Sequence, residues 1–254
     1  MNKLIVSIIV LAFAFLPINA FSAVEFNSTT SSVDTPNSAR LDGLGPLTFS
    51  AWIYPRSEGE GAASRVYTKG VFTDGTGFHA LHFPVGTNRL RFVKDGTTDV
   101  QRQASDNSVT LDKWQHVLVT WNGSTTASNI HIYVNGNETT YAASTNGVTL
   151  NADSGTDFFI GTDSGGANTF DGYIAEAALW NVVLTVEEIR KLAFGVRYTP
   201  LSVRPSALLQ YFPMNECAEA HSCTGTGKVR DYSIYMNHAT PSAALGRSDQ
   251  VSYP

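Results

Sequence analysis

Short runs of residues that alternate between apolar and polar recur along most of the chain, and turn-forming residues separate them. Because successive side chains of a β-strand point to opposite faces, an alternation of period two indicates strands that are buried on one face. Many such strands in series, bounded by Gly, Asn, Asp and Pro, are typical of a sandwich or barrel. We therefore expect an all-β fold, with strands in the runs 47–54, 89–94, 114–121, 130–134, 157–161 and 173–180.

Two dipeptides predict tight turns between strands. They are Asp95-Gly96 and Asn135-Gly136. Both residues of each pair tolerate a positive φ, which the common two-residue hairpin turns require.

Residues 185–195 depart from the strand pattern. Thr185 and Glu188 have the spacing of a capping box, in which each side chain satisfies a backbone N–H of the other residue. The apolar residues that follow fall on one helical face, and Gly195 ends the run. The segment predicts a single short helix that lies against the sandwich.

The N-terminus has the layout of a secretory signal peptide, assigned here to residues 1–23. Lys3 supplies a positive charge, residues 4–16 are almost wholly apolar, and small residues follow Pro17. Cleavage after Ala20, Ser22 or Ala23 would fit equally well. The alternative is an uncleaved anchor, although the apolar run is shorter than the ~20 residues of a spanning helix. We therefore expect a secreted, periplasmic or cell-surface protein with no stable membrane span after signal removal.

Residues 24–254 fit one domain, since an all-β sandwich fills roughly 200–250 residues. Residues 199–205 contain two prolines and look like an extended connector, and residues 207–214 are strand-like again. The tail, residues 200–254, is too short for a good core of its own. We expect it to complete the main sandwich.

Charge and cysteine content narrow the classes of partner. The chain has 17 basic and 22 acidic residues, and removal of Lys3 with the signal leaves 16 against 22, a net charge of −6. A mildly acidic protein with scattered charges lacks the clustered basic patch that is typical of nucleic-acid binding. After export, Cys217 and Cys223 are expected to form a disulfide, with two free thiols as the alternative.

Three stretches together resemble the laminin-G-like jelly rolls of the concanavalin A-like lectin/glucanase superfamily. They cover roughly residues 24–194, and the tail stretches 211–216 and 231–239 look like a segment that usually precedes such domains. The resemblance implies a two-sheet antiparallel jelly-roll sandwich with a rearranged strand order. The three stretches are 47–55, then 111–123 continued by 132–136, and then 159–161 with 170–176, 179–181 and 184–189.

The catalytic signature of the superfamily's glucanases is absent. Those enzymes carry Glu-x-Asp-x-x-Glu on one strand, and glycosidases need two carboxylates at the scissile bond. Here Asp171 and Glu176 have an odd separation, so on one strand they would face opposite sides. His79 and His82 are three apart on an expected strand, so one is expected to be half-buried and the other exposed rather than paired on a metal. We expect a non-catalytic protein.

Calcium is a possible cofactor that the resemblance implies, since many laminin-G-like domains hold it at the rim of the sandwich. Ca²⁺ takes six to eight oxygen ligands, which rim loops rich in Asp and Asn supply. The alternative is that these side chains only make turns by bonding their own backbone. The candidate ligands are Asp153, Asp157, Asp163 and Asp171, with Asn151 and Asn168 beside them.

Sugar binding needs an aromatic platform with polar groups on a shallow face. Trp52 and Tyr54 share a strand face opposite Phe49, Ala51 and Ile53, and are the leading candidates. The lesser candidates are Tyr67, Phe78, His79 and Arg91. The alternative for the tryptophans 52, 114 and 180 is packing in the core. We expect a secreted binding or adhesion module, with a glycan or an extracellular or surface protein as partner. The alternatives are a structural or protein-interaction component of an envelope or particle, and a remote glycoside hydrolase or polysaccharide lyase.

Overall fold

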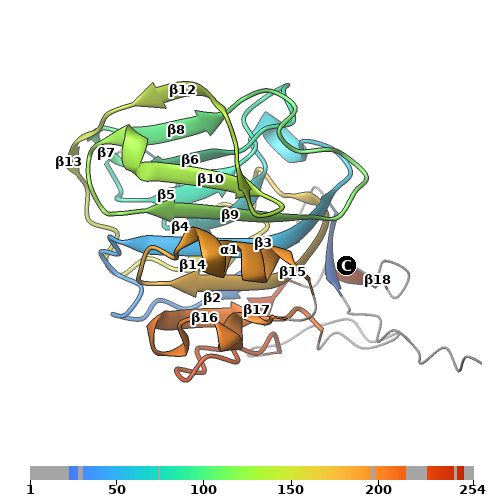
Figure 1. Cartoon of the computed structure of the whole chain (residues 1–254). Helices are drawn as coiled ribbons and strands as arrows, with labels where there is room; N and C mark the ends of the chain where they lie inside the picture. The colour runs from blue at the N-terminus through green and yellow to red at the C-terminus, as the bar shows by residue number, and fades with distance from the viewer. Residues whose placement is uncertain are drawn as a thin grey trace, which may run out of the picture.

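The computed structural model describes residues 23–27, 31–73, 75–195, 198–215, 228–242 and 245–248. Two large antiparallel sheets lie face to face (Figure 1). Sheet A has the order β11-β10-β9-β3-β15-β1-β18, with β16 also paired to β15, and sheet B has the order β12-β8-β6-β5-β4-β14-β2-β17. A separate small pair joins β13 to β7. The predicted all-β, two-sheet jelly-roll sandwich is confirmed.

The strands are short, as the spacing of the turn residues predicts. In sheet A they are β1 (Ala23–Asn27), β3 (Leu47–Pro55), β9 (Gln115–Trp121), β10 (Ile130–Val134), β11 (Asn137–Glu138), β15 (Asp171–Trp180), β16 (Leu208–Phe212) and β18 (Gly246–Ser248). In sheet B they are β2 (Val33–Thr35), β4 (Arg65–Lys69), β5 (His79–His82), β6 (Arg91–Lys94), β8 (Val100–Ala104), β12 (Tyr141–Thr145), β14 (Phe158–Ile160) and β17 (Thr240–Pro241). The small pair is β7 (Gly96–Thr98) and β13 (Val148–Leu150).

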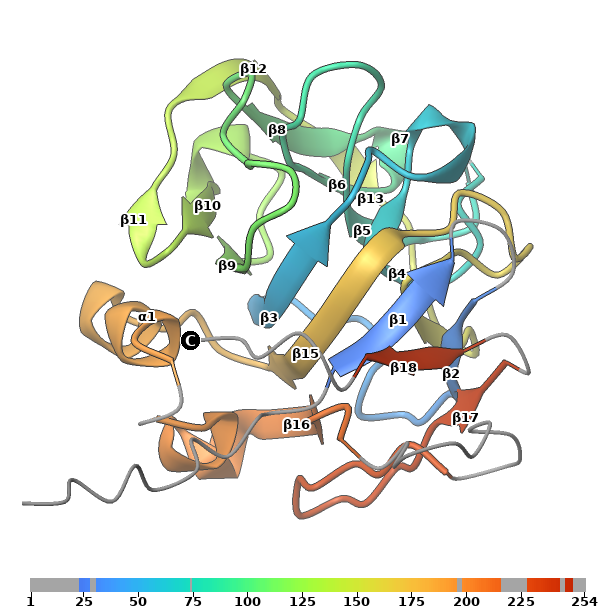
Figure 2. The same cartoon turned by 90° about the vertical axis from the view of Figure 1, so that its right-hand side faces the viewer.

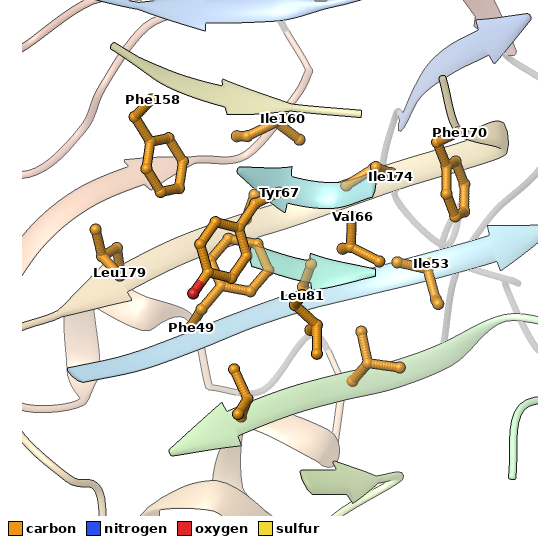
Figure 3. Packing of buried hydrophobic residues seen from close by; sticks show 14 of the residues in the cluster. Phe49, Ile53, Val66, Tyr67, Leu81, Phe158, Ile160, Phe170, Ile174 and Leu179 are labelled. Atoms are coloured by element: carbon orange, nitrogen blue, oxygen red, sulfur yellow. The ribbon is translucent and has the colours of Figure 1, made fainter. Parts of the chain in front are cut away.

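Aromatic rings from both sheets fill the space between them. Phe49 of sheet A lies 4.2 Å from Tyr67 of sheet B, and Tyr67 stacks on Phe158 at 5.2 Å, measured between ring centroids. Figure 3 shows these rings surrounded by aliphatic side chains of both layers. A buried aromatic side chain removes about 150–250 Å² from water, so this cluster is a major source of stability.

The one α-helix, α1 (Val186–Ala193), is placed as the sequence predicts. Thr185 and Glu188 form the expected capping box. Ile189 and Leu192 are buried against Leu118 and Trp180 on the outer face of sheet A. Figure 1 shows α1 lying across β9, β3 and β15. Short 3-10 helices occur at Glu60–Ala62, Ala127–Asn129, Pro200–Ser202 and Pro205–Ala207.

Only one of the two predicted tight turns is present. Asn135 and Gly136 have positive φ and join β10 to β11, which confirms that turn. The Asp95-Gly96 turn is wrong, because Gly96 begins β7 and pairs with Leu150 of β13. The Asp95 carboxylate accepts N–H bonds from Gly75 and Gly77, so it fixes the loop between β4 and β5 instead of turning the chain.

The described part of the tail adds strands to both sheets. β16 pairs with β15, β18 pairs with β1, and β17 pairs with β2 (Figure 2). The Asp231 carboxylate accepts bonds from the backbone N–H groups of Tyr211, Ser233 and Asn237, which ties the tail to β16. The expected signal peptide, apart from Ala23, and the expected disulfide between Cys217 and Cys223 lie outside the described residues. No helix in the described ranges is long and apolar enough to cross a membrane.

Candidate functional site

The outer face of sheet A carries Trp52 and Tyr54, as the alternation along β3 predicts. Trp52 is 6% exposed and lies edge-on to His116. The Tyr54 ring is half-buried, with its centroid 5.8 Å from both Trp114 and Tyr173. These rings meet edge to face at 66°, so they do not form one continuous flat platform. The α-helix covers the other end of this face.

Tyr67 and His79 face the interior of the sandwich. Both are fully buried, and the Tyr67 hydroxyl lies 3.1 Å from His79 Nδ1. Burial, with Asp153 next, raises the pKa of Tyr67, and burial together with Lys94 and Lys69 lowers the pKa of His79. Neither side chain is accessible to a ligand from either outer face.

The expectation that one of His79 and His82 is exposed is wrong. The two side chains do point to opposite faces of sheet B, but both are 0% exposed. His79 is covered because it lies between the sheets. His82 is on the outer face, where Phe72 from the loop between β4 and β5 packs against it at 5.4 Å. Alternation predicts the face of a strand but not the loop that covers it.

Arg91 belongs to a group of cationic and aromatic side chains on the outer face of sheet B, the arginine–histidine cluster of Arg65, Phe72, His82 and Arg91. Strand pairing brings the group together, because His82 lies opposite both Arg65 on β4 and Arg91 on β6. Arg65 Nη1 lies 3.0 Å from His82 Nδ1, and Arg91 Nε donates to His82 Nε2 at 2.9 Å. The Arg65 guanidinium lies 3.6 Å from the Phe72 ring centroid, a cation–π contact.

The cluster carries more positive than negative charge. Burial, followed by Arg65 and Arg91, holds the pKa of His82 well below its usual value, so the imidazole is neutral. Burial lowers the pKa of Arg65 to about 10, which still leaves it charged at neutral pH. The nearest carboxylate to Arg65 is that of Asp163, 3.9 Å from Nη2. Arg65 Nε is buried and has no hydrogen-bond partner.

The four predicted calcium ligands already have protein partners. Asp153 is fully buried and its carboxylate lies 3.4 Å from Lys94 Nζ. Asp157 accepts the backbone N–H of Asn37, and Asp171 binds Arg56 and Ser57. In the Asp163 loop, the carboxylate accepts from Gly165, Ala167 and Asn168, as expected of a turn-forming Asp. No group of three or more His, Cys, Asp and Glu in the described ranges is arranged to hold a metal.

These carboxylate oxygens therefore do not form a set of ligands that fits Ca²⁺. A hard divalent cation needs several oxygens that converge on one point. Here the carboxylates bind ammonium, guanidinium and N–H groups instead, and a cation placed beside Asp153 would meet Lys94. Calcium binding stays an untested prediction, which the chemistry of these side chains does not favour.

Three members of the cluster were not among the residues predicted to bind a ligand. Arg65 comes directly before Val66 and Tyr67, and Phe72 lies in a loop. His82 was interpreted together with His79 as a pair that does not bind a metal. The cross-strand register of β4, β5 and β6 brings them together, and a single sequence does not reveal that register. The available signal was the alternation of His82 with the apolar Leu81 and Phe83.

The chain belongs to the concanavalin A-like lectin/glucanases superfamily, whose family model matches residues 27–190. No curated protein sequence matches the chain. Among solved structures, a putative carbohydrate binding protein from Bacteroides ovatus is similar, with 18% identity and a TM-score of 0.58, over 91% of this chain and 60% of that one. A heptameric pentraxin from Limulus polyphemus has 15% identity and a TM-score of 0.48, over 71% and 86% of the two chains. A sialidase carbohydrate-binding module from Ruminococcus gnavus, bound to sialyllactose, has 14% identity and a TM-score of 0.48, over 66% and 96%.

Proposed function

We propose that this protein is a non-catalytic carbohydrate-binding module that acts outside the cytoplasm. The observation that carries the proposal is a half-buried aromatic ring, Phe72, and a half-buried arginine, Arg91, which both contact His82 on the outer face of sheet B. Sugars are bound by such pairs, because a ring packs on the apolar face of a pyranose while planar polar groups bond its hydroxyls. The similar structure from Bacteroides ovatus is a putative carbohydrate binding protein, which supports the same class of ligand.

The neighbouring residues extend a polar surface away from the cluster. Gln103 lies opposite Arg91, and Gln101 lies opposite Val93, so both amides share the outer face of β8 and β6. Both are half-buried. The strands beneath are held by paired backbones, so the surface is rigid before a ligand arrives, which lowers the entropy lost on binding.

The first experiment is binding of the purified protein to a glycan array, with and without EDTA. We expect glycan binding that survives EDTA, since the predicted calcium ligands already have protein partners. Phe72→Ala is expected to weaken binding about ten-fold through the loss of the ring contact. The matched control is Phe194→Ala, which removes a 74% exposed Phe on the opposite side of the sandwich.

Each outcome of the array experiment has a definite meaning. Absence of glycan binding under all conditions overturns the proposal. Loss of binding in EDTA would show that calcium is required and that its ligands rearrange. Release of reducing sugar from polysaccharide panels would favour the hydrolase alternative.

A second candidate function, protein interaction, is favoured by the surface beyond α1. Phe194 is 74% exposed and Tyr198 37%. With Glu187, Arg190 and Lys191 they line an open hollow of about 300 Å³. Exposed aromatic groups with a charged rim are typical of interaction sites. If Phe194→Ala abolished attachment to cells while Phe72→Ala did not, this candidate would replace the first.

A further inference from the structure

The arginine–histidine cluster lacks an acceptor that its hydrogen-bond donors require. We propose that the saccharide bound on the outer face of sheet B is acidic, and that its carboxylate or sulfate ester binds at Arg91, backed by Arg65. This inference rests on the proposed function and names the chemical class of its ligand.

The first step concerns the lone pairs of His82. A neutral imidazole has one N–H and one acceptor nitrogen. Yet the two ring nitrogens face Arg65 Nη1 at 3.0 Å and Arg91 Nε at 2.9 Å. Arginine only donates, so one of these two contacts brings two donors together. His82 also bonds the backbone of Phe83, and Arg65 Nη1 donates to the Ala63 carbonyl at 2.6 Å, so Arg65 Nε is the donor left without an acceptor. Protonation of His82 would make both contacts donor to donor, and the burial that lowers its pKa opposes it.

The second step concerns the donors that remain. Arg65 is 2% exposed, and its Nε is buried without a partner. Within the described residues, the two Nη groups of Arg91 have no hydrogen-bond partner, since its only bond is from Nε to His82. Buried donors nearly always have a hydrogen-bond partner, so Arg65 Nε, the buried one of these groups, requires an acceptor. The Nη groups of Arg91 reach solvent and are free to donate to a ligand.

The third step concerns charge. The Asp163 carboxylate lies 3.9 Å from Arg65 and already accepts three N–H bonds. The Asp99 carboxylate acts on Arg91, and Asp106 is engaged by Arg89. Arg65 thus has only a distant counter-ion that is shared with three N–H groups, so a monoanionic ligand beside Arg91 would lower the electrostatic cost of the buried guanidinium.

Access favours Arg91 as the primary contact. Arg91 and Phe72 are half-buried and reach solvent, whereas Arg65 and His82 lie beneath them. A carboxylate or sulfate can accept two parallel N–H bonds from the Nη groups of an arginine, and such charge-assisted pairs are about twice as strong as neutral ones. The sugar ring attached to that anion would then lie against the edge of Phe72, because Arg65 and Phe78 occupy the faces of that ring.

The test compares each acidic saccharide with its neutral partner by isothermal titration calorimetry at low salt. One pair is oligogalacturonate and its methyl ester, and the other is a sulfated carrageenan oligosaccharide and its desulfated, neutral form. Preference within a pair identifies carboxylate or sulfate as the anion. We expect at least one acidic form to bind about ten-fold tighter or more, with affinity that falls as salt rises. Arg91→Gln is expected to remove that difference.

Two controls separate charge recognition from misfolding. Arg40→Gln makes the same charge change at an exposed position between β2 and β3, and is expected to leave the preference intact. Arg91→Lys keeps the charge but loses the paired N–H geometry, so it is expected to retain only part of the preference. Unfolding temperatures of all variants are measured alongside.

The outcomes distinguish this inference from the proposed function. Equal affinity for acidic and neutral forms overturns the inference while the proposed function stands. Absence of binding to any saccharide overturns both. Equal binding of polyglutamate would show a general polyanion surface and also overturn it.

Discussion

Three buried histidines show how residue-level chemistry depends on surroundings that a sequence does not display. His79, His82 and His116 are each at most 1% exposed. Burial lowers the pKa of all three, to about 3 for His116, whose Nε2 lies 2.8 Å from the Ser50 hydroxyl. Each of them therefore stays neutral in the folded state at pH values where the unfolded chain takes up a proton.

This difference predicts that the protein loses stability as pH falls. A histidine with a folded pKa of about 3 and an unfolded pKa near 6.5 contributes fully above pH 6.5, and its contribution is lost between pH 6.5 and 3. His116→Gln should reduce the slope of unfolding free energy against pH by about 1.4 kcal/mol per pH unit within that window. The measurement is urea unfolding of both proteins from pH 7 to 4.

The titration of Asp34 has the opposite effect on stability, so its contribution has to be separated from that of His116. Burial, with Asp157 next, raises its pKa to about 6, so the folded state binds this proton first as pH falls. The effect is the same in wild type and variant, so the difference between the two curves isolates His116. Parallel curves would show that His116 is not held neutral by folding.

The predicted binding residues show what alternation can and cannot supply. It correctly separated Trp52 and Tyr54 from Phe49 on β3, because both faces follow from period two. It gave no way to tell that Tyr67 stacks on Phe158 between the sheets. Nor could it place Arg65 beside His82, since cross-strand register depends on the whole sheet.

At the level of elements, local sequence signals were reliable where the chain itself supplies both partners. The capping box of α1 is complete within four residues, and the Asn135-Gly136 turn needs only its own φ angles. Asp95-Gly96 failed because its carboxylate bonds Gly75 and Gly77, about twenty residues earlier. Local signals therefore predict elements best when no distant segment competes for them.

The cap predicts the effect of a single substitution. Thr185→Ala removes the acceptor for the Glu188 N–H and leaves the Glu188 carboxylate without its hydroxyl partner. We expect a loss of about 1 kcal/mol in the free energy of unfolding, measured with urea. The control is Thr125→Ala, an exposed Thr in the loop that follows β9.

Two results would contradict the role of the cap. No change in Thr185→Ala would mean that packing of Ile189 and Leu192 alone fixes the helix. A loss of glycan binding in this variant would show that α1 and the outer face of sheet B are coupled, which their positions on opposite sheets do not predict.

At the scale of the whole molecule, the family resemblance predicted the sandwich but did not predict which face of it binds a ligand. The fold needs two sheets with apolar inner faces, and the alternating runs supply both. The choice of face depends on which outer surface the rest of the chain covers: α1 lies on sheet A, whereas the cluster is on sheet B. Which outer face a helix or loop covers is decided by tertiary packing, so the sequence pattern of the strands does not predict it.

The most direct test of the account is amide chemical-shift mapping of the protein as the tightest-binding saccharide is added. We predict that the shifts concentrate on residues 65–72 and 79–94 and on Gln101 and Gln103, the outer face of sheet B, and that α1 is unaffected. Shifts concentrated instead around Trp52, Tyr54 and Tyr173 would contradict it and assign binding to the outer face of sheet A.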